Sequence, residues 1–215
     1  MKKSLIISIV IVIISTILAI WFIMNTEGNI PIHWNAAGEI DGYGPPSAIF
    51  IFPGVSLFMT LLLYFLPKID PKGDNIKKSG PFLPILTVLL SILMLGIQII
   101  TILAANYSDI ISINIFLSLL LAILFGIMGF YLPGVKPNYM VGLRTPWTLH
   151  SEEVWIKTHK ASGKWFILTG VLFLIGMFIK DPYNIIIPIV CMAIIMIGIV
   201  IYSYILFTKE HRQKE

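Results

Sequence analysis

The sequence predicts an all-α membrane protein with about six transmembrane helices, and three observations support this fold class. First, 57% of the 215 residues are hydrophobic and only 12% are charged, about half the charge of an ordinary soluble domain. Second, the apolar residues gather in stretches of about 20, the helix length that crosses a bilayer core. Third, the basic residues lie between those stretches on alternating sides. This composition excludes intrinsic disorder, and a single cysteine excludes a disulfide-stapled domain.

Each long apolar stretch is expected to form a helix, because a helix satisfies its own backbone hydrogen bonds in lipid. The first follows Lys2 and Lys3 and exceeds the apolar length of a signal peptide, so we expect an uncleaved span. The fourth carries Ser118, Ala122 and Gly126 at intervals of four, a row that favours close approach of a neighbouring helix. The fifth is the shortest. The predicted spans are residues 5–24, 48–66, 81–105, 110–132, 165–179 and 184–207.

The placement of Lys and Arg predicts the orientation of these spans, because cytoplasmic connections retain basic residues. Fourteen of the 15 lie on one set of alternating connections and tails, whereas Lys180 alone lies on the other. Both termini are therefore expected in the cytoplasm of a multi-pass cell-membrane protein. We expect two units, a two-span unit at residues 1–66 and a four-span unit at residues 67–215. No ionisable side chain lies near the middle of a predicted span, which argues against an ion-coupled transporter.

The external connection, residues 25–47, is expected to form a short, ordered, hairpin-like cap. Pro31 favours an extended entry, and Asp41 with the following glycine predicts a turn. Three acidic residues and no Lys or Arg favour a cationic ligand, and the aromatic residues also suit the lipid headgroup zone. His33, Glu39 and Asp41 form a weak candidate metal site; a hydrogen-bonded histidine is the preferred interpretation, and no cofactor is expected. The predicted ligand-binding residues are His33, Trp34, Asn35, Gly38, Glu39, Asp41 and Tyr43.

The cytoplasmic segment 141–164 is expected to form an amphipathic helix at the inner membrane surface. Ser151 predicts a helix start, with two glutamates in the following turn. Thr145 and Pro146 predict another start, and Arg144 before them is expected to pair with a carbonyl, an acid or a lipid phosphate. Apolar and small residues share one face, and lysines on another face are expected to meet anionic lipid.

An enzyme is not expected, because the sequence contains no complete catalytic motif. Glu152-Glu153-x-x-x-Lys157 is similar to the EExxxR signature of intramembrane CAAX-type metalloproteases, with Lys in place of Arg. A metalloprotease is therefore the weakest alternative. A permease-like or lipid-handling protein ranks above it, with His33 and Arg144 at opposite mouths of a polar path.

Two motifs resemble those of known membrane proteins. The pattern IPxHWNxxGxxDGYG at residues 30–44 looks like a domain of unknown function found at the start of many small Gram-positive membrane proteins. The string GLRTPWT at residues 142–148, with the residues that follow it, resembles the SdpI/YfhL family. The signature residues of the second motif are Arg144, Thr145, Pro146, Trp147, Thr148, Glu153, Trp155 and His159.

This resemblance implies a polytopic protein of the bacterial plasma membrane. Its implied function is immunity and signalling: the protein protects against, or senses, a secreted antimicrobial peptide, and it recruits a small helix-turn-helix repressor to the membrane. The expected partners are therefore membrane lipids, a peptide toxin and such a repressor. Direct binding of nucleic acid is not expected.

Overall fold

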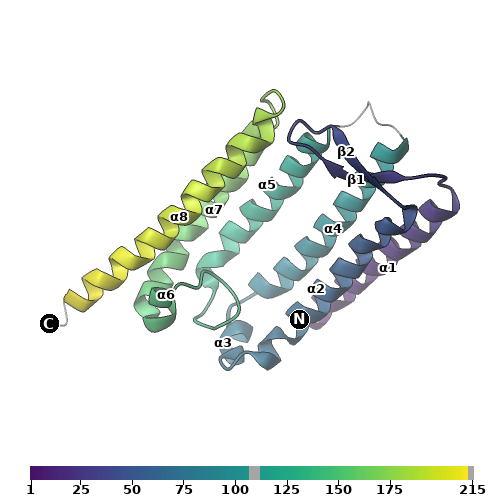
Figure 1. Ribbon diagram of the computed structural model, residues 1–215. Coiled ribbons are helices and arrows are strands. Elements are labelled where there is room, and N and C mark those ends of the chain that lie inside the picture. The colour runs from purple at the N-terminus through teal and green to yellow at the C-terminus, as the bar shows by residue number, and fades with distance from the viewer. Residues whose placement is uncertain (107–111, 213–215) are drawn as a thin grey trace.

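The computed structural model of the chain describes residues 1–106 and 112–212, and long helices dominate this part (Figure 1). Within these described residues, five helical segments are long and apolar enough to cross a membrane, and the chain is a multi-pass all-α membrane protein. The first two residues of the predicted span 110–132 lie outside the described residues. The long apolar helices are α1 (Lys2–Met24), α2 (Ile51–Ile69), α4 (Phe82–Asn106), α5 (Ile113–Tyr131) and α8 (Tyr183–Arg212), and short 3-10 turns η1 (Pro46–Phe50) and η2 (Leu132–Gly134) flank α2 and α5.

The fifth predicted span is the second half of a longer helix, α7 (Glu152–Gly176). The expectation of a separate amphipathic helix lying at the inner surface was therefore wrong. No proline separates the two halves, and one buried face continues from Trp155 through Ser162 to Phe173, so the helix has no reason to end. α7 packs along α5 and α8 (Figure 1). The total of six spans stays a prediction. The charged first half of α7 makes it too polar to count among the helices that could cross a membrane by length and composition.

Small residues bring α5 and α7 into close contact. A Cβ atom added at Gly170 of α7 would lie 2.8 Å from the carbonyl oxygen of Ala122 and 2.9 Å from the backbone nitrogen of Gly126. Ser118, one turn before Ala122, is fully buried. The predicted approach of a neighbouring helix to this row is confirmed.

Polar side chains at mid-depth bond to one another between α1, α2 and α4. Gln98 is fully buried; its Nε2 donates to the carbonyl oxygen of Ser15 at 2.9 Å, and its Oε1 accepts from the Ser15 hydroxyl. The hydroxyls of Thr60 and Ser91 lie 3.3 Å apart. These groups satisfy each other's hydrogen bonds in an apolar medium and so do not favour a polar path. They also connect the predicted unit 1–66 to α4, and the division of the chain into two units stays a prediction.

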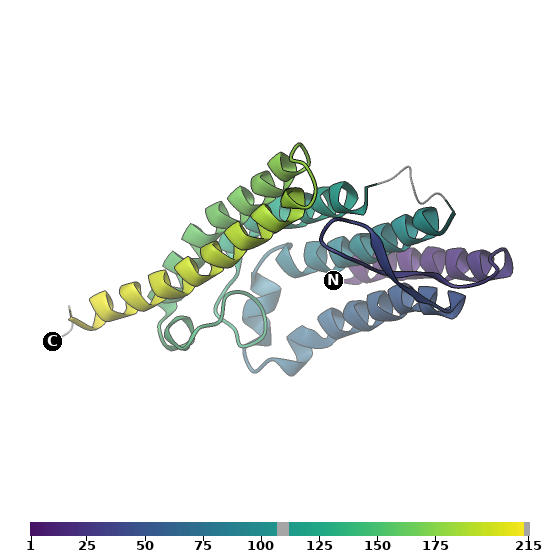
Figure 2. The same cartoon turned by 45° about the horizontal axis from the view of Figure 1, so that its top comes forward.

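The two ends of the bundle carry different structures. A two-stranded hairpin covers one end, and the short helices α3 (Gly73–Lys78) and α6 (Pro146–His150) lie at the other (Figures 1 and 2). Helix α1 begins and helix α8 ends at the α3–α6 end (Figure 1). The assignment of this end to the cytoplasm stays a prediction. A buried cluster that includes Trp155, Leu83 and Val135 fills the interior there.

Candidate functional site

The connection predicted to be external, residues 25–47, contains an antiparallel hairpin of β1 (Ile30–Trp34) and β2 (Ile40–Gly44). This result confirms the predicted ordered cap. Pro31 lies within β1 in an extended conformation, as expected, and β1 packs against α4. The hairpin therefore places its side chains over the helix ends that lie opposite α3 and α6.

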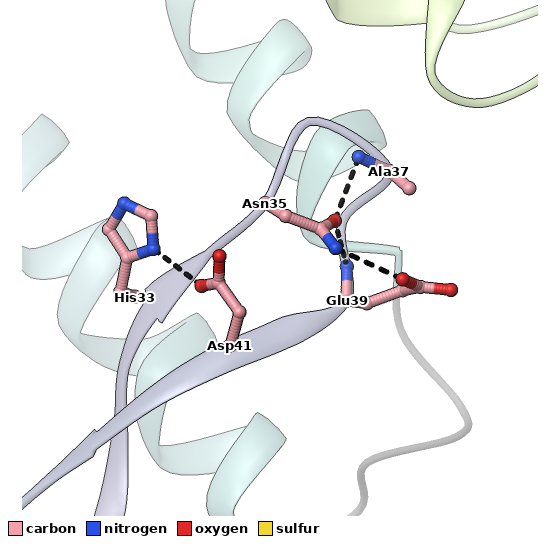
Figure 3. Close-up of polar contacts among 5 residues, drawn as sticks. All are labelled: His33, Asn35, Ala37, Glu39 and Asp41. Carbon is pink, nitrogen blue, oxygen red and sulfur yellow. Dashed lines mark hydrogen bonds and ion pairs between the residues drawn. The ribbon is translucent and has the colours of Figure 1, made fainter.

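The turn of the hairpin is centred on Asn35 and Gly38, which corrects the prediction of a turn at the Asp-Gly pair 41–42. The Asn35 Oδ1 atom accepts hydrogen bonds from the backbone amides of Ala37, at 2.9 Å, and Glu39, at 3.1 Å (Figure 3). Gly38 has a φ of +79°, a conformation that other residues resist. Because these two residues satisfy the turn, the Asp-Gly pair extends into β2.

His33 and Asp41 face each other across the hairpin, with His33 Nδ1 and Asp41 Oδ1 2.5 Å apart (Figure 3). Glu39 lies apart from them, and its Oε2 accepts a hydrogen bond from Asn35 Nδ2 at 3.0 Å. The structure thus brings together only two of the three proposed metal ligands. Among residues 1–106 and 112–212, no three His, Cys, Asp or Glu side chains are grouped to hold a metal. The preferred interpretation, a hydrogen-bonded histidine, fits this geometry.

Two apolar hollows lie beneath β1, one on each side, and Ile32 and Trp34 line both. The hollow toward α2 has a volume of about 420 Å³ and includes Phe52. The hollow toward α5 has a volume of about 280 Å³ and includes Leu117. Tyr43 on β2 is exposed. The hairpin end of the bundle therefore offers apolar space of the size that one or two large side chains would fill.

Asn114, near the start of α5, ties the hairpin to the rest of the bundle. Its buried Nδ2 donates to the carbonyl oxygen of Ala36 at 3.1 Å and to Asp181 Oδ1 at 2.7 Å. The Asn184 Oδ1 atom, at the start of α8, lies 3.5 Å away. Sequence analysis missed this residue; the only sequence feature that marks it is an amide at the second position of an apolar helix. One side chain thus joins the hairpin turn, α5 and the connection into α8.

At the other end of the bundle, His159 and Trp155 hold the preceding connection against α7. His159 is fully buried and stacks on Trp155, with ring centroids 4.2 Å apart. Its Nε2 accepts from the backbone amide of Leu143 at 3.1 Å, so Nδ1 carries the proton and donates to the Trp155 carbonyl at 2.9 Å. Trp155 Nε1 donates to the Val135 carbonyl at 2.8 Å. Gly142 has a φ of +103° and leaves no space for a Cβ atom beside the His159 ring.

The next signature residues form the start of α6, as predicted. Thr145 Oγ1 accepts from the Thr148 amide at 3.2 Å, and Thr148 Oγ1 accepts from the Thr145 amide at 2.8 Å. Pro146 occupies the first helical position, where its missing amide costs nothing. Thr145 Oγ1 also lies 3.1 Å from the Ser203 hydroxyl of α8. The cap therefore fixes α6 and attaches it to α8.

Arg144 and Trp147 lie on the surface of this assembly. Arg144 Nη1 donates to the carbonyl oxygen of Tyr139 at 2.7 Å, so its partner is a carbonyl, one of the three kinds expected. The Trp147 ring packs against Tyr204 of α8, with centroids 5.1 Å apart. Arg144 thus stabilises the connection, and Trp147 packs α6 against α8.

The start of α7 has the predicted cap. Ser151 Oγ accepts from the Val154 amide at 3.3 Å and donates to Glu210 Oε2 of α8 at 2.5 Å. Glu153 in the first turn forms an ion pair with Lys157. Glu153, one of the two glutamates in the segment similar to the metalloprotease motif, is therefore already paired with a lysine. Both ends of the α6–α7 corner are attached to α8.

Side chains from the α2–α3 corner also hold the connection, and sequence analysis did not identify them. Asp70 Oδ2, at the end of α2, accepts from the Tyr139 amide at 2.9 Å. Asn75 Nδ2, in α3, donates to the Pro137 carbonyl at 2.7 Å. Asp70 is buried, and an isolated acid directly after an apolar helix is the signal that could have found it. The signature residues therefore belong to a structured layer rather than to a free loop.

The comparisons with known proteins fit these two sites. The family model of the SdpI/YfhL protein family matches residues 134–205, and that of a domain of unknown function, DUF1648, matches residues 10–57. Immunity protein SdpI of Bacillus subtilis (strain 168) is 30% identical over 211 residues, which cover 97% of this chain and 98% of that protein. No solved structure matches the chain significantly. Similarity at this level along nearly the whole length shows that the chain belongs to the SdpI/YfhL family.

Proposed function

We propose that this membrane protein gives its cell immunity to a secreted, cationic, amphipathic peptide that it binds at the outer hairpin. The observation that carries the proposal is the pairing of exposed acidic side chains with apolar hollows on one small, ordered surface. The similar Bacillus subtilis protein is named an immunity protein, which supports the same class of function here.

The chemistry of the hairpin suits such a peptide. Glu27, Glu39 and Asp41 are exposed, and residues 25–47 contain no Lys or Arg, so the surface attracts cations. Trp34 borders both hollows and is only partly buried, which leaves its ring available to apolar side chains. A helix or strand with one basic and one apolar face would satisfy both features at once.

We further propose that occupancy of the hairpin is reported at the opposite end through α8, where a small helix-turn-helix repressor binds. The outer contact is Asn114, which bonds to Asp181 directly before α8. The inner contacts are the bonds from Thr145 to Ser203 and from Ser151 to Glu210. A shift of α8 would change both sets of contacts, which is the physical requirement for coupling two distant sites.

Survival of cells challenged with the peptide tests the immunity proposal. A deletion strain is exposed to culture medium of its parent and to each peptide encoded near the gene, with the wild-type chain, Trp34→Ala or Trp21→Ala supplied on a plasmid. Trp21 is a matched control because it lies on α1, is exposed, and lines neither hollow. We expect cells that carry Trp34→Ala to be killed at a peptide concentration about 30-fold lower than cells that carry the wild-type chain. This is the effect of losing a central aromatic contact.

Equal survival of the deletion strain and its parent under every challenge would overturn the immunity proposal. The reporting step has its own test, in which a fluorescent repressor encoded beside the gene is imaged with and without the peptide. Movement of the repressor to the membrane only when the peptide is present supports the reporting step. Arg144→Gln is expected to reduce this movement while the amount of the membrane protein stays unchanged. A repressor that stays in the cytoplasm contradicts the step alone.

A further inference from the structure

A groove between α7 and α8 has no role in the function proposed above. Two cavities of about 490 Å³ each adjoin there, and Ala161, Trp165 and Tyr202 line both of them. They therefore form one continuous depression, which we call the α7–α8 groove. The half lined by the earlier residues of α7 lies nearer the end of the bundle that carries α6, because α7 begins there.

One half of the α7–α8 groove is strongly positive. Lys157, Lys160 and Lys164 line it at helical spacing. Lys157 already has Glu153 as a partner, whereas none of the ion pairs in the described part of the chain involves Lys160 or Lys164. Both of these side chains are exposed. Two neighbouring ammonium groups of this kind favour an anion between them.

The other half of the α7–α8 groove is apolar. Its floor contains Ile194 and Gly198 of α8, and nothing lies within 4 Å of a Cβ atom added at Gly198. Trp165 and Tyr202 stand at the boundary between the halves, where amphipathic rings favour a membrane–water interface. The charged half thus lies at headgroup level, and the apolar half extends into the hydrocarbon.

We propose that the α7–α8 groove binds one anionic phospholipid, with its phosphate held by Lys160 and Lys164 and an acyl chain along Gly198. In the predicted orientation this lipid belongs to the inner leaflet. A free phosphate would leave the apolar half unused. A second copy of the chain, related by a two-fold axis, would bring the same lysines of both copies together, which like-charge repulsion disfavours.

Lipid retention by the purified full chain tests the proposal. The chain in mild detergent is mixed with equal amounts of phosphatidylglycerol and phosphatidylcholine that carry the same acyl chains, and native mass spectrometry measures which lipid is retained. We expect preference for phosphatidylglycerol. The double variant Lys160→Gln/Lys164→Gln should lose about 25-fold in this preference, since each lysine near an anionic headgroup contributes about fivefold. Lys3→Gln/Lys78→Gln removes the same charge from exposed positions outside the groove and should retain the preference.

Gly198→Leu tests the apolar half, because nothing lies within 4 Å of the new Cβ atom and the side chain extends into the α7–α8 groove that Gly198 lines. We expect weaker retention of phosphatidylglycerol with unchanged helical circular dichroism and thermal transition. The proposal is overturned if Lys160→Gln/Lys164→Gln and Lys3→Gln/Lys78→Gln show the same preference for phosphatidylglycerol. Displacement of the lipid by inorganic phosphate, with no effect of Gly198→Leu, identifies a free-anion site and also overturns it. The proposal is also overturned if the purified chain is a dimer that Gly198→Leu dissociates, because a second copy of the chain then occupies the α7–α8 groove.

Discussion

Replacing Asn114 by Asp should detach the hairpin turn from the helices while leaving the shape of the side chain almost unchanged. The Asn114 Nδ2 atom has two hydrogens and two close acceptors, the Ala36 carbonyl at 3.1 Å and Asp181 Oδ1 at 2.7 Å. Aspartate cannot donate to either, and it places a second carboxylate beside Asp181. One lost bond is neutral and one is to a charged group, so we expect a destabilisation of about 2–4 kcal/mol.

Hydrogen exchange and thermal unfolding of the purified chain in detergent measure this effect. In Asn114→Asp, the backbone amides of Ala37 and Glu39 should exchange faster, and the melting temperature should fall. Asn25→Asp is the matched control, because Asn25 also lies at the hairpin end of the bundle, but its side chain donates to the Trp21 carbonyl of the helix that it follows. Equal exchange at the turn and equal melting in the two variants would refute the reasoning that Asn114 joins the hairpin to α5 and α8.

The other predictions concern the packing of α7. Gly170→Ala should destabilise the chain by about 1–3 kcal/mol, because its Cβ meets the α5 backbone; Gly198→Ala, with open space around it, should not lower the melting temperature. Trp155→Phe removes the hydrogen bond to Val135 and should cost about 1 kcal/mol in denaturant unfolding. Burial lowers the pKa of His159, which precedes the predicted span 165–179, from 6.5 to about 4. Stability should therefore be complete above pH 6.5 and fall as the pH drops toward 4; His159→Gln should flatten that dependence in melting curves.

Local sequence signals located the helix caps correctly and predicted an ordered hairpin within residues 25–47. Ser151 and Thr145 were identified as helix starts because a cap depends on side chains within three residues of the helix end. The turn of the hairpin was misplaced because two turn signals lie close together in this connection. The choice between them involves Gly38, where an added Cβ would lie 3.2 Å from Asn114 Nδ2. That contact comes from a helix far along the chain and is invisible to a local pattern.

The signature at residues 144–159 was recognised as a motif, but its physical role could not be predicted. Trp155 and His159 are buried among groups contributed by the preceding connection. Asp70 and Asn75, which hold that connection from the α2–α3 corner, are more than 60 residues away in sequence. The lysine-bearing segment suggested a surface helix because its own charge pattern is amphipathic. It continues into the bundle because its small-residue face packs on α5.

Composition and spacing alone determined that this chain resides in a lipid bilayer. The free energy of inserting a helix into the bilayer depends mainly on how many apolar residues lie in unbroken runs of about 20. They also located the two connections that carry the motifs, residues 25–47 and 141–164, since polar residues must gather where the backbone leaves the hydrocarbon. Only the tertiary structure decided which side chains meet: the attachment of the hairpin through Asn114, the close contact of α5 with α7, and the α7–α8 groove. These contacts join residues that are distant in sequence, and their energies depend on the three-dimensional positions of both partners.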